Sequence, residues 1–460
     1  MAGGNVGCQT DEAGDREGAM MSAARDFFLT DHARIARALP GADLPWLARQ
    51  RAAALDIFAQ RGMPTRRDED WKYTSLAAWE KQSFPALPQY PGQDGLAAAL
   101  VKDLAIEGGY LLVFHNGRYA PALSSPGSPP SGVTLESLAE ALAQHPDMPE
   151  PYLTRDESGS AFGALNTAFM ADGAYLHLAR GKALDVPVHL VFLSTSPGSA
   201  SHVRNLVVAE AGAQVSVIEH YAGIENAAYM TNAVTSIFAE NGAIVEHHKL
   251  QRESDGALHV AGIHALQQRE SRFASHNFAM GGGLARNDIT TAFDATGCEA
   301  VLNGLYLAGG RQHIDNHTCI DHRQPNGTSR EYYRGVLDGA AHAVFNGRVI
   351  VQPGAQKTNA CQTNHNLLLS REAEIDTKPQ LEIFADDVKC NHGATVGQLD
   401  ENQLFYLRSR GVEEAMARML LVHAFAHDVI ERVRIASLRE HLERILLARL
   451  PQAEQTGERP

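Results

Sequence analysis

Two side chains that can bind metal lie two residues apart near the end of the sequence. Cys390 and His392 fall within the segment 381–397, LEIFADDVKCNHGATVG, and a glycine follows them directly. In an extended strand, side chains two residues apart point to the same side, so both would face one way with Val388 beside them. Thiolate and imidazole are ligand types that suit zinc, copper and iron–sulfur clusters. Two donors are too few to close such a site, so further ligands must come from elsewhere, for instance from another chain.

A second run of metal-binding residue types alternates along one segment, at His313, Asp315, His317, Cys319 and Asp321. Alternate residues of a strand lie roughly 6.6 Å apart, so at most two of these five side chains can converge on one ion. We therefore expect no independent metal site in this segment.

Two histidines near the end of the chain lie four residues apart, His423 and His427, in a segment with helical periodicity. This spacing can bind zinc. The pair lacks the glutamate of the zinc-binding motif His-Glu-x-x-His, and no third ligand is evident from the sequence. Packing or contact with a partner protein is the expected role.

Cys390 taken alone would be interpreted as a small buried hydrophobic residue, because most free cysteines are buried.

The overall charge excludes some classes of protein. The chain has 460 residues, with 40 Lys and Arg against 54 Asp and Glu, so its net charge is −14. A nucleic-acid binder would normally show a basic footprint, and an acidic chain is repelled by anionic membrane. The five cysteines are Cys8, Cys298, Cys319, Cys361 and Cys390. Their odd number and irregular spacing argue against a disulfide framework and favour a reducing cytoplasm.

Targeting and membrane signals are not recognised in the sequence. No run of 18 apolar residues occurs, and residues 1–20 are acidic and glycine-rich, without the apolar segment of a secretory signal. We interpret residues 1–21 as a disordered tail, and Met20 or Met21 is a plausible later start. No Gly-x-x-x-x-Gly-Lys-Ser/Thr motif is found, so P-loop nucleotide binding is not expected.

The predicted secondary structure changes twice along the chain. Residues 22–62 have helical periodicity, and Gly62 with Pro64 ends that segment. From about 105 to 400, short β-like runs separated by Gly, Asn and Asp predominate, with no convincing amphipathic helix. This pattern argues against a doubly wound α/β sheet. A β-sandwich, a β-propeller and a parallel β-helix all remain compatible with the sequence, and no repeat period decides among them. The chain is helical again from about 401.

Several motifs in the correct order resemble the SufB/SufD family, the scaffold subunits of the SUF iron–sulfur cluster assembly system. The segment 381–411 resembles the family's C-terminal core motif, and Asp315 and His322 match its mid-core pattern and are expected to make structural hydrogen bonds. Further matches are NGLY at 303–306, GVL at 335–337, VFNG at 344–347, AQKT at 355–358 and NLLLS at 366–370. GMPT at 62–65 and DWKYT at 70–74 are similar to the SufD branch, with Trp71 and Tyr73 expected to be core or docking residues.

The resemblance implies a fold and a set of partners. The implied fold is mainly β, a right-handed parallel β-helix core with an N-terminal helical region and a C-terminal helical domain. It implies a heterodimer with SufB through the edge of the β-helix, and binding of the ABC-type ATPase SufC by the C-terminal helices. His392 would face a SufB cysteine beside a nascent iron–sulfur cluster, with Cys390 next to that site. Reduced flavin is a further cofactor implied for complexes of the family, and no motif here locates it.

The expected organisation along the chain follows from these observations. It is a disordered tail at 1–21, an N-terminal helical region at 22–104, the parallel β-helix at 105–400, a SufC-binding helical domain at 401–450 and a second disordered tail at 451–460. The expected function is that of a non-enzymatic scaffold in the cytoplasm. Two alternatives remain open: a SufB-like or homodimeric scaffold, and a β-helix metal-dependent enzyme such as a lyase. Such an enzyme would need clustered carboxylates or basic catalysts on successive coils, and the sequence identifies no such cluster.

Overall fold

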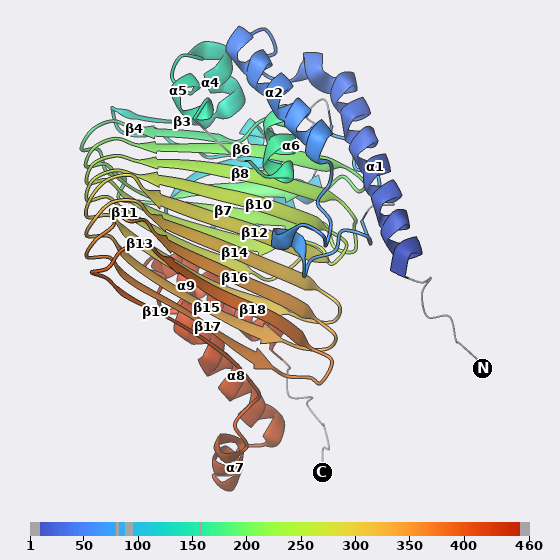
Figure 1. The fold of residues 1–460 in the computed structure, drawn as a ribbon, viewed down its shortest axis with the longest axis vertical. Coiled ribbons are helices and arrows are strands. Elements are labelled where there is room, and N and C mark those ends of the chain that lie inside the picture. The colour runs from blue at the N-terminus through green and yellow to red at the C-terminus, as the bar shows by residue number, and fades with distance from the viewer. Residues whose placement is uncertain (1–9, 80–81, 88–94, 156–158, 451–460) are drawn as a thin grey trace, which may run out of the picture.

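The computed structural model describes residues 10–79, 82–87, 95–155 and 159–450, with side chains from residue 23 onward. Its central part is a parallel β-helix, in which the chain winds through about eight coils that each place one strand in either of two facing sheets (Figure 1). This confirms the predicted fold class. Among the described residues, no helix is both long and apolar enough to cross a bilayer.

The strands alternate strictly between the two sheets from β4 onward. The nine-stranded sheet contains, in spatial order, β18 (Glu374–Ile383), β16 (His342–Val351), β14 (His313–His322), β12 (Leu284–Phe293), β10 (Leu258–Gln267), β8 (Met230–Ala239), β6 (Ala200–Ala209), β4 (Ala174–Leu178) and β3 (Val133–Ser137). The ten-stranded sheet contains β19 (Lys389–Gly397), β17 (Asn359–Leu368), β15 (Thr328–Leu337), β13 (Glu299–Ala308), β11 (Arg272–Ala279), β9 (Ile244–Arg252), β7 (Gln214–Gly223), β5 (Val188–Ser194), β1 (Tyr110–His115) and β2 (Arg118–Tyr119).

Side chains alternate between the lumen of the helix and its outer faces, as the period of a strand requires. Inward-facing Ile263 and Ile289 are in register on neighbouring coils and belong to the main buried core. Polar groups also occupy the lumen, where they bond to one another. Lys249 is fully buried, and its Nζ donates to Oδ1 of Asn287 and lies 2.8 Å from Nε2 of His259.

Variable coil length explains why the sequence shows no repeat period. From β6 to β18, successive strands of the nine-stranded sheet begin 30, 28, 26, 29, 29 and 32 residues apart. The registers remain unbroken across these differences, because the turns between strands absorb the extra residues.

The N-terminal end of the β-helix is covered by helices and by antiparallel pairs. Strand β1 pairs antiparallel with β2, and β3 pairs antiparallel with β4. Helices α1 (Thr10–Ile35), α2 (Pro45–Arg61) and α3 (Gly95–Leu104) precede the first strand. Helix α1 begins within the segment 1–21 that was expected to be a disordered tail, whereas residues 1–9 and the expected tail at 451–460 lie outside the described residues.

The sequence of residues 105–400 shows no convincing amphipathic helix, but the structure has helices in that range. Helices α4 (Leu138–Gln144), α5 (Glu150–Leu153) and α6 (Ala161–Phe169) lie within that range. Helix α6 packs against α2 on one side and against β6 and β8 on the other, and eight of its nine residues are buried. Its sequence, AFGALNTAF, has no charged residue, so it lacks the charged face that is typical of a surface helix.

Three C-terminal helices, α7 (Glu401–Ser409), α8 (Glu414–Ile430) and α9 (Ala436–Arg449), follow the last strand. Apolar residues of α8 and α9, such as Val429 and Leu442, pack against outward-facing Leu305 and Leu250 of the ten-stranded sheet. Helix α7 extends away from the body of the molecule (Figure 1). Its Phe405 and Tyr406 are 74% and 57% exposed.

Candidate functional site

In the part of the chain that the structure describes, the β-helix ends in two strands that each lack a neighbour on one side. Strand β18 pairs only with β16 in the nine-stranded sheet, and β19 pairs only with β17 in the ten-stranded sheet. Exposed apolar side chains occur at this end, namely Ile383, Phe384 and Val396, which are 41%, 60% and 49% exposed. Unpaired strand edges with exposed apolar groups are a ready template for pairing with another chain.

The two residues that the sequence predicted as ligands both lie on β19, on this open edge. Cys390 is in register with buried Ala360 and His392 with buried Gln362, so both belong to the inward-facing row of the last coil. No further coil of the described residues covers them, and the His392 side chain is exposed. The structure therefore brings the pair to one face, as their spacing predicted.

Cys390 differs from His392 in its surroundings. It is partly buried and packs with Val388 against a small apolar cluster that includes Val349 and Ala360. Burial raises the pKa of the Cys390 thiol, and a backbone hydrogen bond with Ala360 only partly opposes this. Because a metal binds the thiolate, Cys390 is less ready to act as a ligand than the exposed imidazole of His392.

A row of polar side chains leads from the interior of the β-helix to His392. Glu331 on β15, Gln362 on β17 and His392 on β19 are in register on the same inward face. Nε2 of Gln362 donates to Oε2 of Glu331 at 2.6 Å. Gly347 faces this row across the lumen, where an added Cβ would lie 2.1 Å from Nε2 of Gln362. Gln362 therefore needs a glycine opposite it to fit directly beneath the last coil.

Burial raises the pKa of Glu331 to about 7, although the hydrogen bond from Gln362 and the nearby Thr318 lower it in part. A glutamate in the unfolded chain has a pKa of 4.5, so the folded protein keeps this proton over a range where the unfolded chain has lost it. The contribution of Glu331 to the free energy of unfolding therefore falls as the pH rises from 4.5 to 7. Above pH 7 the full loss of stability remains.

We expect the substitution Glu331→Gln to remove this cost. The variant should be more stable than the wild type, and its gain in free energy of unfolding should be about 2 kcal/mol larger at pH 8 than at pH 5. Urea unfolding of both proteins at both pH values gives the measurement. Glu253→Gln is the matched control. Glu253 is equally buried, but His259 lowers its pKa despite the opposing effect of burial, so that variant should lose stability. An equal effect of Glu331→Gln at both pH values would contradict the raised pKa.

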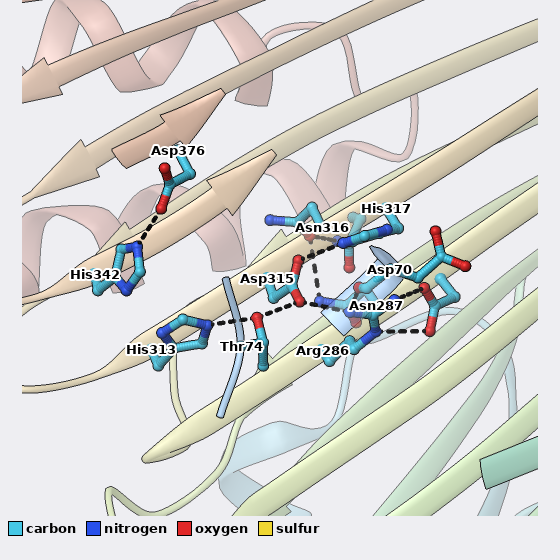
Figure 2. Close-up of polar contacts among 12 residues, drawn as sticks. Asp70, Thr74, Arg286, Asn287, His313, Asp315, Asn316, His317, His342 and Asp376 are labelled. Atoms are coloured by element: carbon cyan, nitrogen blue, oxygen red, sulfur yellow. Dashed lines mark hydrogen bonds and ion pairs between the residues drawn. The ribbon is translucent and has the colours of Figure 1, made fainter. Parts of the chain in front are cut away.

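A second polar site joins the N-terminal region to the outer face of the nine-stranded sheet (Figure 2). Oδ2 of Asp315 on β14 accepts a hydrogen bond from the Thr74 hydroxyl at 2.6 Å and lies 2.7 Å from Nη1 of Arg286 on β12. Oδ1 lies 3.0 Å from Nε2 of His317. Burial alone would raise the pKa of Asp315, but His317 and Arg286 hold it well below its usual range. The predicted structural role of Asp315 is confirmed.

The motif DWKYT at 70–74 supplies the other half of this contact. The Arg286 guanidinium lies 4.1 Å from the ring centroid of Trp71, and its Nη1 donates to the backbone carbonyl of Asp70 at 2.6 Å. The buried Trp71 ring in turn stacks on Phe162 of α6, with centroids 5.4 Å apart. Trp71 is therefore a docking residue, as predicted, and its partner Arg286 was not identified from the sequence.

Two further residues that the sequence singled out, His322 and Cys319, lie within the β-helix and on its outer face, respectively. His322 is buried in the lumen, where its Nε2 lies 2.9 Å from the Ser329 hydroxyl, which confirms its predicted hydrogen bond. A groove of about 350 Å³ runs over the nine-stranded sheet beside Trp71 and includes Cys319 in its lining. Burial raises the pKa of the Cys319 thiol. In the same groove Arg286 and Asp288 form a bidentate ion pair, so these two groups are already engaged with each other.

Comparison with known proteins agrees with the fold and with the motifs. Residues 192–425 match the model of the SUF system FeS cluster assembly SufBD core domain, and residues 25–190 match that of the SufBD protein N-terminal region. A SufBD family protein of Synechocystis is 34% identical over 88% of this chain and 91% of its own length. The SufD proteins of Escherichia coli and Bacillus subtilis are 32% and 26% identical, over 86% and 87% of this chain and 92% and 93% of their own lengths. The chain therefore belongs to the SufBD family of SUF-system iron–sulfur cluster assembly proteins.

Proposed function

We propose that this chain is a non-catalytic, cytoplasmic scaffold subunit of a SufBCD-type complex, and that His392 helps to hold a nascent iron–sulfur cluster at the boundary with a SufB-type subunit. One observation carries the proposal: an exposed imidazole on the last, unpaired strand of the β-helix, at an edge that can pair with a second β-helix. The cluster is here the cargo of the complex, and Cys390 is the second candidate ligand.

A site divided between two chains suits an assembly scaffold. The scaffold must hold iron and sulfide firmly enough to build a cluster, and it must then release the product. Separation of the two chains removes ligands from a shared site, so the release step needs no change in the fold of either chain. An imidazole in place of a thiolate leaves less negative charge on the cluster, as in Rieske centres.

The C-terminal helices are the proposed binding site for a SufC-type ATPase. Phe405 and Tyr406 on the projecting helix α7 are the most exposed large apolar residues there, and exposed aromatic groups are typical of protein interfaces. This surface is distinct from the β18–β19 edge, so one chain has room for both partners.

The substitution Ala394→Pro tests the proposed edge. Lys389 directs its backbone N–H to β17, so the even-numbered residues of β19, Ala394 among them, direct theirs to the open edge. Ala394→Pro removes one such donor without removing a hydrogen bond of the chain itself, and edge strands tolerate proline. We expect the variant to co-purify with a SufC-type partner but to lose a SufB-type partner, with its thermal unfolding nearly unchanged.

Retention of the SufC-type partner is the internal control, because Ala394→Pro leaves the C-terminal helices untouched. Undiminished recovery of the SufB-type subunit would exclude pairing through β19. The same edge could also join two copies of this chain in isolation, and the mass of the purified chain alone distinguishes a monomer from a homodimer.

A further inference from the structure

The hairpin formed by α8 and α9 carries a cluster of two histidines and one glutamate. His423 and His427 lie one turn apart on α8, and Glu443 of α9 faces both of them. Nε2 of His423 contacts Oε1 of Glu443, and Nδ1 of His427 lies 3.0 Å from Oε2. No third group was evident from the sequence, because Glu443 comes from the neighbouring helix.

The three potential ligand atoms already lie close together. One ligand atom from each residue can be chosen so that all three lie within 4.8 Å of one another. In a tetrahedral zinc site, bonds of about 2.0–2.1 Å place the ligand atoms roughly 3.4 Å apart. The two imidazole rings are stacked, with centroids 5.4 Å apart and an interplanar angle of 18°. Small side-chain rotations would therefore bring all three groups around one ion.

The backbone that carries these groups is held in place on both helices. Val422 and Ala426, which adjoin the two histidines in sequence, are buried against the ten-stranded sheet, as is Leu442 beside Glu443. The ligands themselves remain accessible, because the side chains of His423, His427 and Glu443 are 25%, 40% and 27% exposed. A metal ion can therefore enter, and water can fill a fourth position.

A hydrogen bond between one histidine and one glutamate does not require this arrangement. His145 pairs with Glu136 at 2.6 Å and His177 with Glu210 at 3.0 Å, each through a single imidazole. On the α8–α9 hairpin, two imidazoles converge on the same carboxylate from adjacent turns of one helix. Histidines at i and i+4 with a carboxylate from another element are a donor set that suits zinc or ferrous iron, whereas calcium and magnesium prefer oxygen ligands alone.

We propose that His423, His427 and Glu443 form a binding site for one divalent transition-metal ion of the zinc or ferrous type, with its remaining position open to water. The ion would join α8 to α9 and so fasten the helical hairpin. This inference depends only on the hairpin and not on the proposed role of His392.

Metal titration of the full chain tests the site. Isothermal titration with Zn²⁺, and separately with Fe²⁺ under anaerobic conditions, should reveal one equivalent per chain that His427→Ala and Glu443→Gln each weaken by more than about tenfold. His145→Ala is the matched control, because it removes a histidine–glutamate pair that lacks a third ligand, and it should leave that equivalent unchanged. Binding of only one of the two ions would identify the metal class.

A second measurement does not depend on how the variants fold. Crystals of the wild-type chain grown with Zn²⁺ should show anomalous difference density at the zinc edge between α8 and α9. Titrations that are identical for wild type, His427→Ala and Glu443→Gln would overturn the proposal. So would zinc density found only at other histidines, such as His248 with His276 or His342 with Asp376.

Discussion

The substitution Asp315→Asn is expected to lower the free energy of unfolding by about 3 kcal/mol. Removing one partner of a buried ion pair leaves the other charge uncompensated, at a cost of about 3–5 kcal/mol. The lower end of that range applies because Arg286 keeps its bidentate pair with Asp288. Asparagine has nearly the same shape, and it still offers Thr74 an acceptor, so the variant isolates the loss of charge.

Urea unfolding of the wild type and of the Asp315→Asn variant gives the measurement, with Asp288→Asn as the control. The Asp288 side chain is 32% exposed, whereas that of Asp315 is inaccessible, so water compensates Asp288 and its variant should lose about 1 kcal/mol. Losses of equal size would show that burial of the Asp315 contact does not matter.

The pH dependence of the Asp315 effect has a definite sign. The pKa of Asp315 is lowered in the folded protein, so its contribution to stability is present above the unfolded value of 3.8 and is lost as the pH falls below it. The difference between the wild type and Asp315→Asn should therefore shrink as the pH falls below 4. A difference that grows on acidification would mean that Asp315 is not held in its charged form.

The sequence predicted the fold class through its motifs, whereas periodicity alone left three β architectures open. Two features of the structure explain why periodicity alone does not identify the β-helix. Coil lengths between 26 and 32 residues obscure the repeat, and the lumen accepts Asn, Glu, His and Lys as well as apolar residues. Lys249 illustrates the second point, because it is a fully buried cation that a pattern of apolar inward positions would place outside.

The candidate site was predictable where it depends on local spacing and unpredictable where it depends on contacts across the fold. The common orientation of Cys390 and His392 follows from the period of a strand. The contact between Thr74 and Asp315 joins residues 241 positions apart, and that between Glu331 and Gln362 joins neighbouring coils 31 positions apart. Glu443 meets His423 only because α9 turns back along α8. No single-sequence pattern encodes such pairings.

His392→Ala is expected to lower the iron and acid-labile sulfide bound by the complex with SufB- and SufC-type partners. Mutation of a residue that only hydrogen-bonds to a metal ligand typically costs about 10–100-fold in metal affinity, and loss of a ligand itself should cost at least as much. Because His392 is exposed on the last coil, the variant should keep the thermal stability of the wild type and should still recruit both partners. Iron and sulfide analysis of the reconstituted complex gives the measurement, and an undiminished cluster content would exclude His392 as a ligand.

The control for this experiment is a histidine at the same end of the sheet that faces the other way. His365 on β17 lies on the outward row, where its Nδ1 lies 2.6 Å from the Thr395 hydroxyl. His365→Ala should leave the cluster content unchanged if only the inward row of the last coil contributes ligands. Cys390→Ala should have a smaller effect than His392→Ala, because the Cys390 thiol is partly buried and its pKa is raised.

The substitution His392→Cys separates binding from release. A thiolate at this position supplies a ligand and adds negative charge to the cluster, so the complex should still assemble a cluster. The thiolate is also the softer donor, and transfer to a recipient protein should therefore become slower than in the wild type. Visible absorption of the reconstituted complex, followed after addition of an apo-ferredoxin, measures both steps. Slower transfer with normal assembly would show that an imidazole is present at this edge because a scaffold must release what it builds.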